Sequence, residues 1–145
     1  LQSDLIARYQ QPQPRTMCSE LVRKHATSAI DVSDGLVADV AHLASASKVQ
    51  IVIRRSSIPL SAAARQVIAN DHGQVNHVWG GGDDYELAFT APRGSQVDKQ
   101  ILESSDVPVT EIGEVIMADG NAGAVTLVDD NGNAIDVDTG GFRHF

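Results

Sequence analysis

The chain has 145 residues, 42% of them hydrophobic, and a formal net charge of −8 at pH 7. It is long enough for one domain with a real core, and it contains no apolar run that could cross a bilayer and no signal-peptide pattern. Nucleic-acid binding is disfavoured, because the 11 Lys and Arg residues are scattered among 19 Asp and Glu. Cys18 is the single cysteine, so we expect no internal disulfide, a buried thiol and a cytoplasmic location.

The first 15 residues have the composition of a linker. A short helical piece leads into the segment 10–15, Gln-Gln-Pro-Gln-Pro-Arg, which is rich in residues that interrupt helices. The chain also begins with Leu1 rather than Met. We therefore expect residues 1–15 to be a linker from a missing N-terminal domain, and residues 16–145 to form a single domain.

Helical periodicity and helix-start residues recur along this domain. These signals predict helices over residues 16–25, 36–47, 61–70 (with Ser61 as the N-cap) and 95–104.

Alternating apolar residues predict strands between the helices. Strands are expected over residues 49–53, 85–90, 124–128 and 134–137, and residues 107–112 and 115–116 look extended. Asn131-Gly132 is a strong hairpin signal between the last two strands. Because helices and strands intermix, we expect an α+β (mixed α/β) domain with a mixed sheet covered by helices.

The segment 28–36, Ser-Ala-Ile-Asp-Val-Ser-Asp-Gly-Leu, is the most informative part of the sequence. If its apolar run is a strand, Asp31 and Ser33 lie on one side and Asp34 lies at the start of the next helix. Magnesium and phosphate oxygens can be held together at such a place. The alternative is that Ser33 or Asp34 is only an N-cap for free backbone N–H groups, and these residues taken alone favour the cap.

A second acidic cluster follows Trp79, with the sequence Gly-Gly-Gly-Asp-Asp-Tyr-Glu over residues 80–86. Glycines allow close backbone approach to a ligand or a positive φ, and three carboxylates within four positions repel one another unless cations or solvent separate them. The segment is neither a P-loop nor an EF-hand. A flexible, solvated loop is one interpretation; the other is a divalent-metal and phosphate site shared with residues 31–34.

No nucleophilic side-chain set stands out, and such a metal and phosphate site would act by positioning and charge neutralisation. The histidines, His72 and His77 included, show no zinc-binding pattern. We expect Asp129, Asp130 and the later hairpin residues Asp136 and Asp138 to be solvated rather than to bind calcium.

Three segments together resemble the bacterial thiamine-monophosphate kinases. They are Ala-Ile-Asp-Val-Ser-Asp-Gly-Leu at 29–36, Gly-Gly-Asp-Asp-Tyr-Glu-Leu at 81–87 and Gly-Phe-Arg-His-Phe at 141–145. The first segment alone is shared with related ATP-dependent synthetases. The combination, which extends over nearly the whole chain, points to this kinase family.

The resemblance implies the C-terminal domain of a two-domain, homodimeric enzyme, with a fold like that of the C-terminal domain of aminoimidazole ribonucleotide synthetase. The family transfers the terminal phosphate of ATP to thiamine monophosphate, giving thiamine diphosphate, with magnesium. Much of the ATP and metal machinery lies in the other half, so we expect the isolated fragment to be inactive.

The resemblance also assigns roles to residues. Asp31 and Asp34 correspond to magnesium ligands and Ser33 to an ATP contact. Asp83, where the family usually has Glu, corresponds to a substrate-binding residue. Phe142, where Tyr is commoner, corresponds to an aromatic side chain against the substrate's ring. No catalytic side chain is assigned, because a phosphate monoester oxygen is already a competent nucleophile.

Two alternatives remain open. The chain could belong to another ATP-dependent synthetase of the same superfamily that acts on a different substrate. It could instead be a non-catalytic module that binds a thiamine phosphate or stabilises a dimer, and such a module would bind its ligand without dependence on magnesium.

Overall fold

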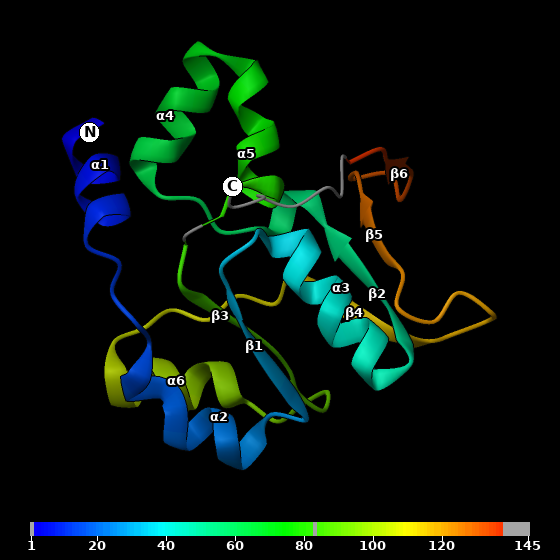
Figure 1. Cartoon of the computed structure of the whole chain (residues 1–145). Helices are drawn as coiled ribbons and strands as arrows, with labels where there is room; N and C mark the ends of the chain where they lie inside the picture. The colour runs from blue at the N-terminus through cyan, green and yellow to red at the C-terminus, as the bar shows by residue number, and fades with distance from the viewer. Residues whose placement is uncertain (1, 83, 138–145) are drawn as a thin grey trace.

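The structure is a computed structural model that describes residues 2–82 and 84–137 (Figure 1). Its helices are α1 (Gln2–Gln10), α2 (Ser19–His25), α3 (Leu36–Ser47), α4 (Ala62–Asn70), α5 (Asn76–Gly80) and α6 (Val97–Ser105). Its strands are β1 (Ser28–Val32), β2 (Val49–Arg54), β3 (Glu86–Thr90), β4 (Gly113–Met117), β5 (Val125–Val128) and β6 (Ala134–Ile135). Three short 3-10 helices are Thr16–Cys18, Arg55–Ser57 and His72–Val75.

The strands form two separate sheets. β1 pairs antiparallel with β3 in a two-stranded sheet. The other four strands follow the order β4-β2-β5-β6, in which β2 runs parallel to β5 and antiparallel to β4. The expected mixed α+β fold is therefore confirmed, with β1 and β3 outside the four-stranded mixed sheet.

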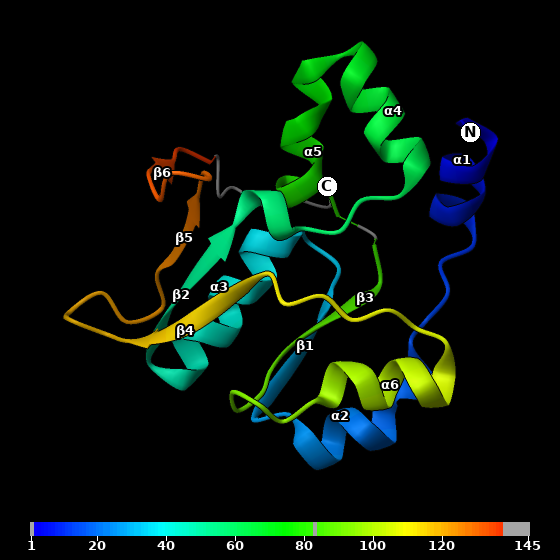
Figure 2. The same cartoon turned by 180° about the vertical axis from the view of Figure 1, so that it is seen from behind.

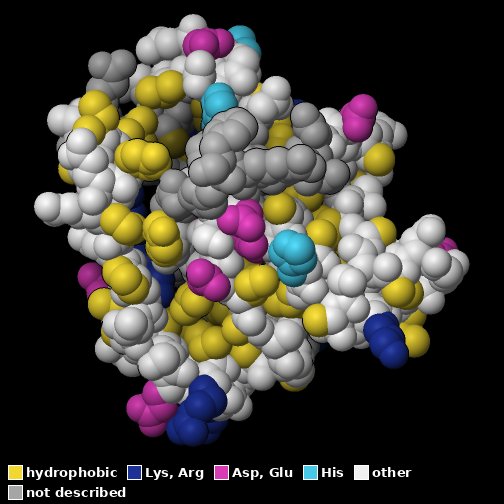
Figure 3. Space-filling model, viewed as in Figure 1, with side chains coloured by type: hydrophobic (Ala, Val, Ile, Leu, Met, Phe, Trp, Pro, Cys, Tyr) yellow, Lys and Arg dark blue, Asp and Glu magenta, His cyan; other side chains and the backbone are white. Residues whose placement is uncertain are grey.

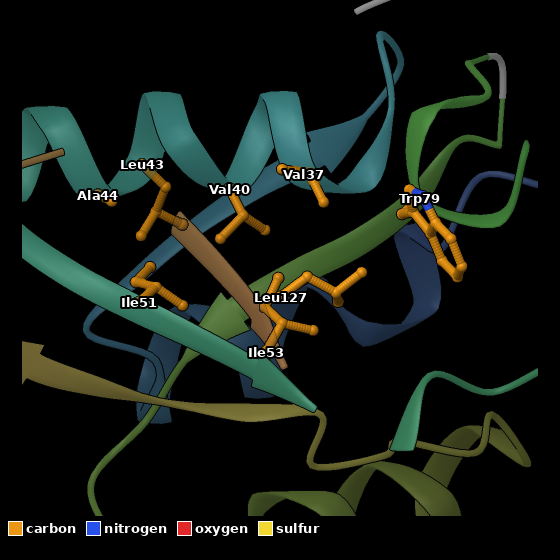
Figure 4. Packing of buried hydrophobic residues seen from close by; sticks show 8 residues of the cluster. All are labelled: Val37, Val40, Leu43, Ala44, Ile51, Ile53, Trp79 and Leu127. Carbon is orange, nitrogen blue, oxygen red and sulfur yellow. The ribbon is translucent and has the colours of Figure 1, made fainter. Parts of the chain in front are cut away.

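Helix α3 joins the two sheets through the main hydrophobic core. It contacts β1, β2, β5 and α5. Figure 4 shows its apolar side chains pointing toward the four-stranded sheet, with Trp79 of α5 at the end of the same cluster. The buried members are Val37, Val40, Leu43, Ala44, Ile51, Ile53, Trp79 and Leu127.

A second, smaller core lies where α2 packs against α6, below the two-stranded sheet in Figure 2. Its buried residues are Cys18, Val22, Val97 and Ile101. The predicted burial of Cys18 is confirmed, since 3% of the residue is exposed. This core supports β3 from the side away from the main core, because Phe89 packs against it.

Several element boundaries agree with the sequence predictions. α3, α4 and β2 lie where the apolar periodicity placed them, and Ser61 is the N-cap of α4, because its Oγ accepts a hydrogen bond from the Ala64 N–H at 3.0 Å. No helix among residues 2–82 and 84–137 combines the length and apolar character that crossing a membrane requires.

Other boundaries differ, and tertiary packing explains those after α6. Ser95 does not cap α6, which begins at Val97 after a left-handed Gln96. Within the expected extended stretch, Val107 and Val109 lie outside any strand and pack on the smaller core. Gly113 then starts β4, where the β2 backbone comes so close that an added Cβ would lie 2.1 Å from the Val52 carbonyl oxygen.

Candidate functional site

The first acidic motif begins at the end of β1. Asp31 pairs with Leu87 of β3 and is exposed, whereas Val32 is buried and ends the strand. Ser33 and Asp34, both half-buried, follow in a loop before α3. The expected strand alternation therefore reaches Asp31 but not Ser33, since the strand stops one residue earlier.

The loop 33–35 is held by a residue that the sequence analysis did not single out. One carboxylate oxygen of Asp39, Oδ2, accepts hydrogen bonds from the N–H groups of Ser33 at 2.8 Å, Asp34 at 3.0 Å and Gly35 at 3.3 Å. Asp39 is 4% exposed. A sequence signal was present, because Asp39 stands beside Val40 in the first turn of a helix whose inner positions are otherwise apolar.

The alternative interpretation of Ser33 and Asp34 as N-caps is wrong for this helix. The N-cap of α3 is Gly35, at φ 128° and ψ 146°, and no N-cap side chain accepts a hydrogen bond there. Asp39 reaches back instead and accepts hydrogen bonds from the N–H groups of the N-cap Gly35 and of the two residues before it. The carboxylates of Asp31 and Asp34 are thus not used to start the helix.

The second motif lies directly beside the first. The backbone N–H of Tyr85 donates to the Val32 carbonyl at 2.8 Å, immediately before the β1–β3 pairing begins. On the other side of the loop, a Cβ added at Gly35 would lie 3.2 Å from the carbonyl carbon and oxygen of Gly80. The fold therefore brings together two segments that are 45 or more positions apart in sequence.

The glycines of the second motif allow close approach within the chain. Gly81 has an ordinary φ of −76°, but a Cβ there would lie 2.5 Å from the His77 carbonyl oxygen. The sequence analysis also missed α5, which ends at Gly80 and buries Trp79 to 6% exposure. Asp83 and Phe142, the two predicted substrate-binding residues, lie outside the described residues.

The side chains of Asp31 and Asp34 make no hydrogen bond or ion pair within residues 2–82 and 84–137. Figure 3 shows acidic side chains exposed on the face viewed in Figure 1, next to hydrophobic surface. Two carboxylates and a hydroxyl are hard oxygen donors that suit Mg²⁺. Across the described part of the chain no three His, Cys, Asp or Glu residues are placed to hold a metal. A cation here therefore needs further ligands.

The third carboxylate of the second cluster has a different role. Glu86 accepts two hydrogen bonds from Arg15, at 2.8 and 2.7 Å, and also pairs with Arg8. Burial alone would raise the pKa of Glu86, but the hydrogen bonds and charges of Arg15 and Arg8 lower it overall. These two cations, from α1 and the segment after it, remove the charge repulsion expected for Glu86 in this cluster.

A cavity of about 330 Å³ borders Trp79. Its lining is apolar apart from one serine and two arginines, and consists of Arg55, Ser56, Ile58, Leu60, Arg65, Val75, Val78 and Trp79. Asp31, Ser33 and Asp34 do not line it. The described site residues thus lie outside this cavity.

The chain was compared with known proteins, and its relatives in sequence carry the same family name. No protein-family model matches the chain. A thiamine-monophosphate kinase of Caulobacter vibrioides is 35% identical over 120 residues, which are 80% of this chain and 34% of that protein. The thiamine-monophosphate kinase of Escherichia coli K12 is 32% identical over 142 residues, or 97% of this chain and 42% of that protein. The chain belongs to the thiamine-monophosphate kinase family.

The solved structures agree with this membership. A thiamine-monophosphate kinase from Stenotrophomonas maltophilia K279a matches with a TM-score of 0.75 and 37% identity, covering 91% of this chain and 40% of that one. AaThiL, solved in complex with AMPPCP and TMP, matches with a TM-score of 0.77 and 30% identity, covering 98% of this chain and 41% of that one. The chain therefore spans less than half the length of these thiamine-monophosphate kinases.

More distant proteins share the fold. E. coli HypE, a hydrogenase maturation protein, matches with a TM-score of 0.65 at 21% identity, over 84% of this chain and 38% of that one. At this identity the likeness concerns architecture only. It shows that the mixed α+β arrangement is not restricted to thiamine-monophosphate kinases.

Proposed function

We propose that this chain is the C-terminal half of a kinase that transfers the terminal phosphate of ATP to thiamine monophosphate, giving ADP and thiamine diphosphate. One observation carries the proposal beyond family membership: the loop 31–35 and the segment 80–86 meet through the Tyr85–Val32 hydrogen bond and the Gly35–Gly80 contact. A relative solved with AMPPCP and TMP supports a nucleotide and a thiamine phosphate as the ligands.

In this proposal Asp31 and Asp34 hold Mg²⁺, and Ser33 contacts ATP. Both carboxylates are available, because neither makes a hydrogen bond or ion pair among the described residues. When bound, Mg²⁺ neutralises the charge of the phosphate oxygens. The remaining metal ligands would come from the part of the protein beyond this chain.

The amides of residues 33–35 do not act as the phosphate site in this proposal. Each already donates to the Asp39 carboxylate, which also places a negative charge where a helix N-terminus otherwise attracts anions. This chain's contribution here is thus to bind a cation and orient it, and the anionic substrates meet that cation. No side chain is assigned as a base, because the phosphate oxygen of thiamine monophosphate is the attacking atom.

Substrate binding is assigned to Asp83 and Phe142. The thiazolium ring is cationic, so a carboxylate at 83 and an aromatic face at 142 are chemically suitable partners. Asp83 is one methylene shorter than the Glu usual in the family, and Phe142 keeps ring stacking without the hydroxyl of Tyr. These two departures are the reason to measure thiamine monophosphate affinity as well as turnover.

The test uses the full-length protein that contains this chain. We expect thiamine diphosphate to form from thiamine monophosphate, ATP and Mg²⁺, and Asp31→Asn or Asp34→Asn to lower the rate by orders of magnitude with little change in melting temperature. Asp98→Asn, an exposed change on α6, is the control and should leave the rate unaltered. Variants that lose stability but keep the rate would return Asp31 and Asp34 to a structural role.

A panel of phosphate acceptors separates the kinase from its alternatives. Product with another acceptor and none with thiamine monophosphate would indicate a different ATP-dependent synthetase. Binding of thiamine monophosphate without magnesium dependence and without turnover would indicate a non-catalytic module. Light scattering on the full-length protein tests the homodimer, and we expect the 145-residue chain alone to turn over no ATP.

A further inference from the structure

The carboxylate of Asp39 is buried beneath the loop that carries the proposed cation ligands. It is 4% exposed, and a charge at such a place is costly unless hydrogen bonds compensate for it. Three backbone N–H groups, at 2.8, 3.0 and 3.3 Å from Oδ2, provide that compensation. Hydrogen bonds to an ionised acceptor are stronger than neutral ones, so this arrangement resists displacement of the loop.

Asp39 is itself rigidly placed. Its own N–H donates to the Gly35 carbonyl at 2.9 Å, so the residue and the loop are linked in both directions. Its neighbour Val40 is 5% exposed and belongs to the main core. The packed helix α3, rather than a solvent-exposed contact, therefore fixes the position of the loop.

Few other contacts orient the carboxylates of Asp31 and Asp34. Asp31 is exposed at the next-to-last position of β1, and the Asp34 side chain has no hydrogen-bonding partner among the described residues. Groups that hydrogen-bond to metal ligands and orient them contribute strongly to metal affinity. Removing such a group typically lowers metal affinity or activity by about 10- to 100-fold. A carboxylate that binds the backbone on either side of Asp34 is in a position to do this.

We infer that Asp39 is a positioning residue, which holds the backbone of residues 33–35 and thereby sets the separation of the Asp31 and Asp34 carboxylates for a divalent cation. This inference rests on the proposed function for the identity of the cation ligands. It adds a residue that touches neither cation nor substrate and acts only through the loop.

Two variants of Asp39 separate the contribution of its hydrogen-bond acceptor from that of its charge. Asp39→Ala removes the acceptor and leaves three amides without it. Asp39→Asn keeps an oxygen of the same reach and removes the charge, so it serves as the conservative variant. Leu43→Ala is the matched control, because Leu43 is buried on the same helix, in the core that holds α3, one turn beyond Asp39.

The experiment measures three quantities on the full-length protein. Mn²⁺ titration followed by electron paramagnetic resonance gives cation affinity without turnover, hydrogen exchange gives the protection of the amides of residues 33–35, and steady-state kinetics give the Mg²⁺ concentration for half-maximal rate. For Asp39→Ala we expect Mn²⁺ affinity to fall at least about tenfold. The half-maximal Mg²⁺ concentration should rise by a similar factor, and exchange at residues 33–35 should accelerate selectively.

For Asp39→Asn we expect values between those of the wild type and Asp39→Ala, and for Leu43→Ala a lower melting temperature with wild-type cation affinity. Equal Mn²⁺ affinity in Asp39→Ala and Leu43→Ala would overturn the inference. If Asp39→Ala does not fold, unchanged Mn²⁺ affinity and exchange in Asp39→Asn would overturn it as well. If the wild type makes no thiamine diphosphate while the Mn²⁺ and exchange effects are found, the proposed function fails and the positioning role stands.

Discussion

Arg15 and Glu86 form a two-pronged ion pair between the segment that follows α1 and the first residue of β3. Nε of Arg15 donates to Oε2 at 2.8 Å and Nη2 donates to Oε1 at 2.7 Å. The hydrogen bond to Glu86 is the main reason that the pKa of Arg15 is raised. Because Glu86 directly follows Tyr85, the pair connects the N-terminal segment to the candidate site.

Glu86→Gln should destabilise the protein by about 1 kcal/mol. A charged, two-pronged pair is stronger than a single contact, but the Glu86 side chain is 44% exposed, and solvent screening reduces the effect. Urea denaturation measures the change. The control is Glu114→Gln, whose partner Arg93 is 87% exposed, and it should have almost no effect. Equal losses in the two variants would show that the Arg15 pair has no special role.

The same pair predicts a pH dependence of stability. The pKa of Glu86 in the folded protein lies below its ordinary value of 4.5, so the unfolded chain binds a proton first as the pH falls. The stabilisation is therefore fully present above about pH 4.5 and is lost as the pH drops through the folded pKa. We expect the wild type to lose more stability than Glu86→Gln between pH 5 and the acid limit of folding, as measured by denaturation at each pH. A constant difference between the two proteins over this range would contradict the prediction.

The sequence predicted the elements whose signals are local. Apolar periodicity located α3, and the Ser61 cap located the start of α4. It did not predict that Asp39, from within α3, would hold the backbone of residues 33–35, because an acidic residue in a first helical turn is common on exposed surfaces. Nor could it show that ion pairs compensate the charge of Glu86, since the two arginines that pair with it are 71 and 78 residues away in sequence.

The smaller core offers a test of how much α6 contributes to the fold. Ile101 has no exposed surface, whereas the next residue, Leu102, is 47% exposed. Ile101→Ala should cost about 2–5 kcal/mol, because it removes buried methyl groups and leaves a cavity, and Leu102→Ala should cost less than about 0.5 kcal/mol. Thermal and urea unfolding measure both. Similar losses in the two variants would contradict the packing of α2 against α6.

Gly35→Ala tests the contact that brings the two motifs together. Gly35 has φ 128° and ψ 146°, a conformation almost confined to glycine, and an alanine there costs about 1–3 kcal/mol in backbone strain alone. Its Cβ would also lie 3.2 Å from the Gly80 carbonyl group, so Gly80 would have to move by a few tenths of an ångström. We therefore expect a loss of stability of at least about 2 kcal/mol.

Gly120→Ala separates backbone strain from this close contact. Gly120 also has a positive φ, 104°, but its added Cβ would have no heavy atom within 4 Å. It should lose less stability than Gly35→Ala. For the activity proposed above, the full-length Gly120→Ala protein should keep the rate that Gly35→Ala loses. Denaturation and thiamine diphosphate formation measure the two effects. If Gly35→Ala retained the rate, the contact between the loop and Gly80 would not be needed to assemble the site.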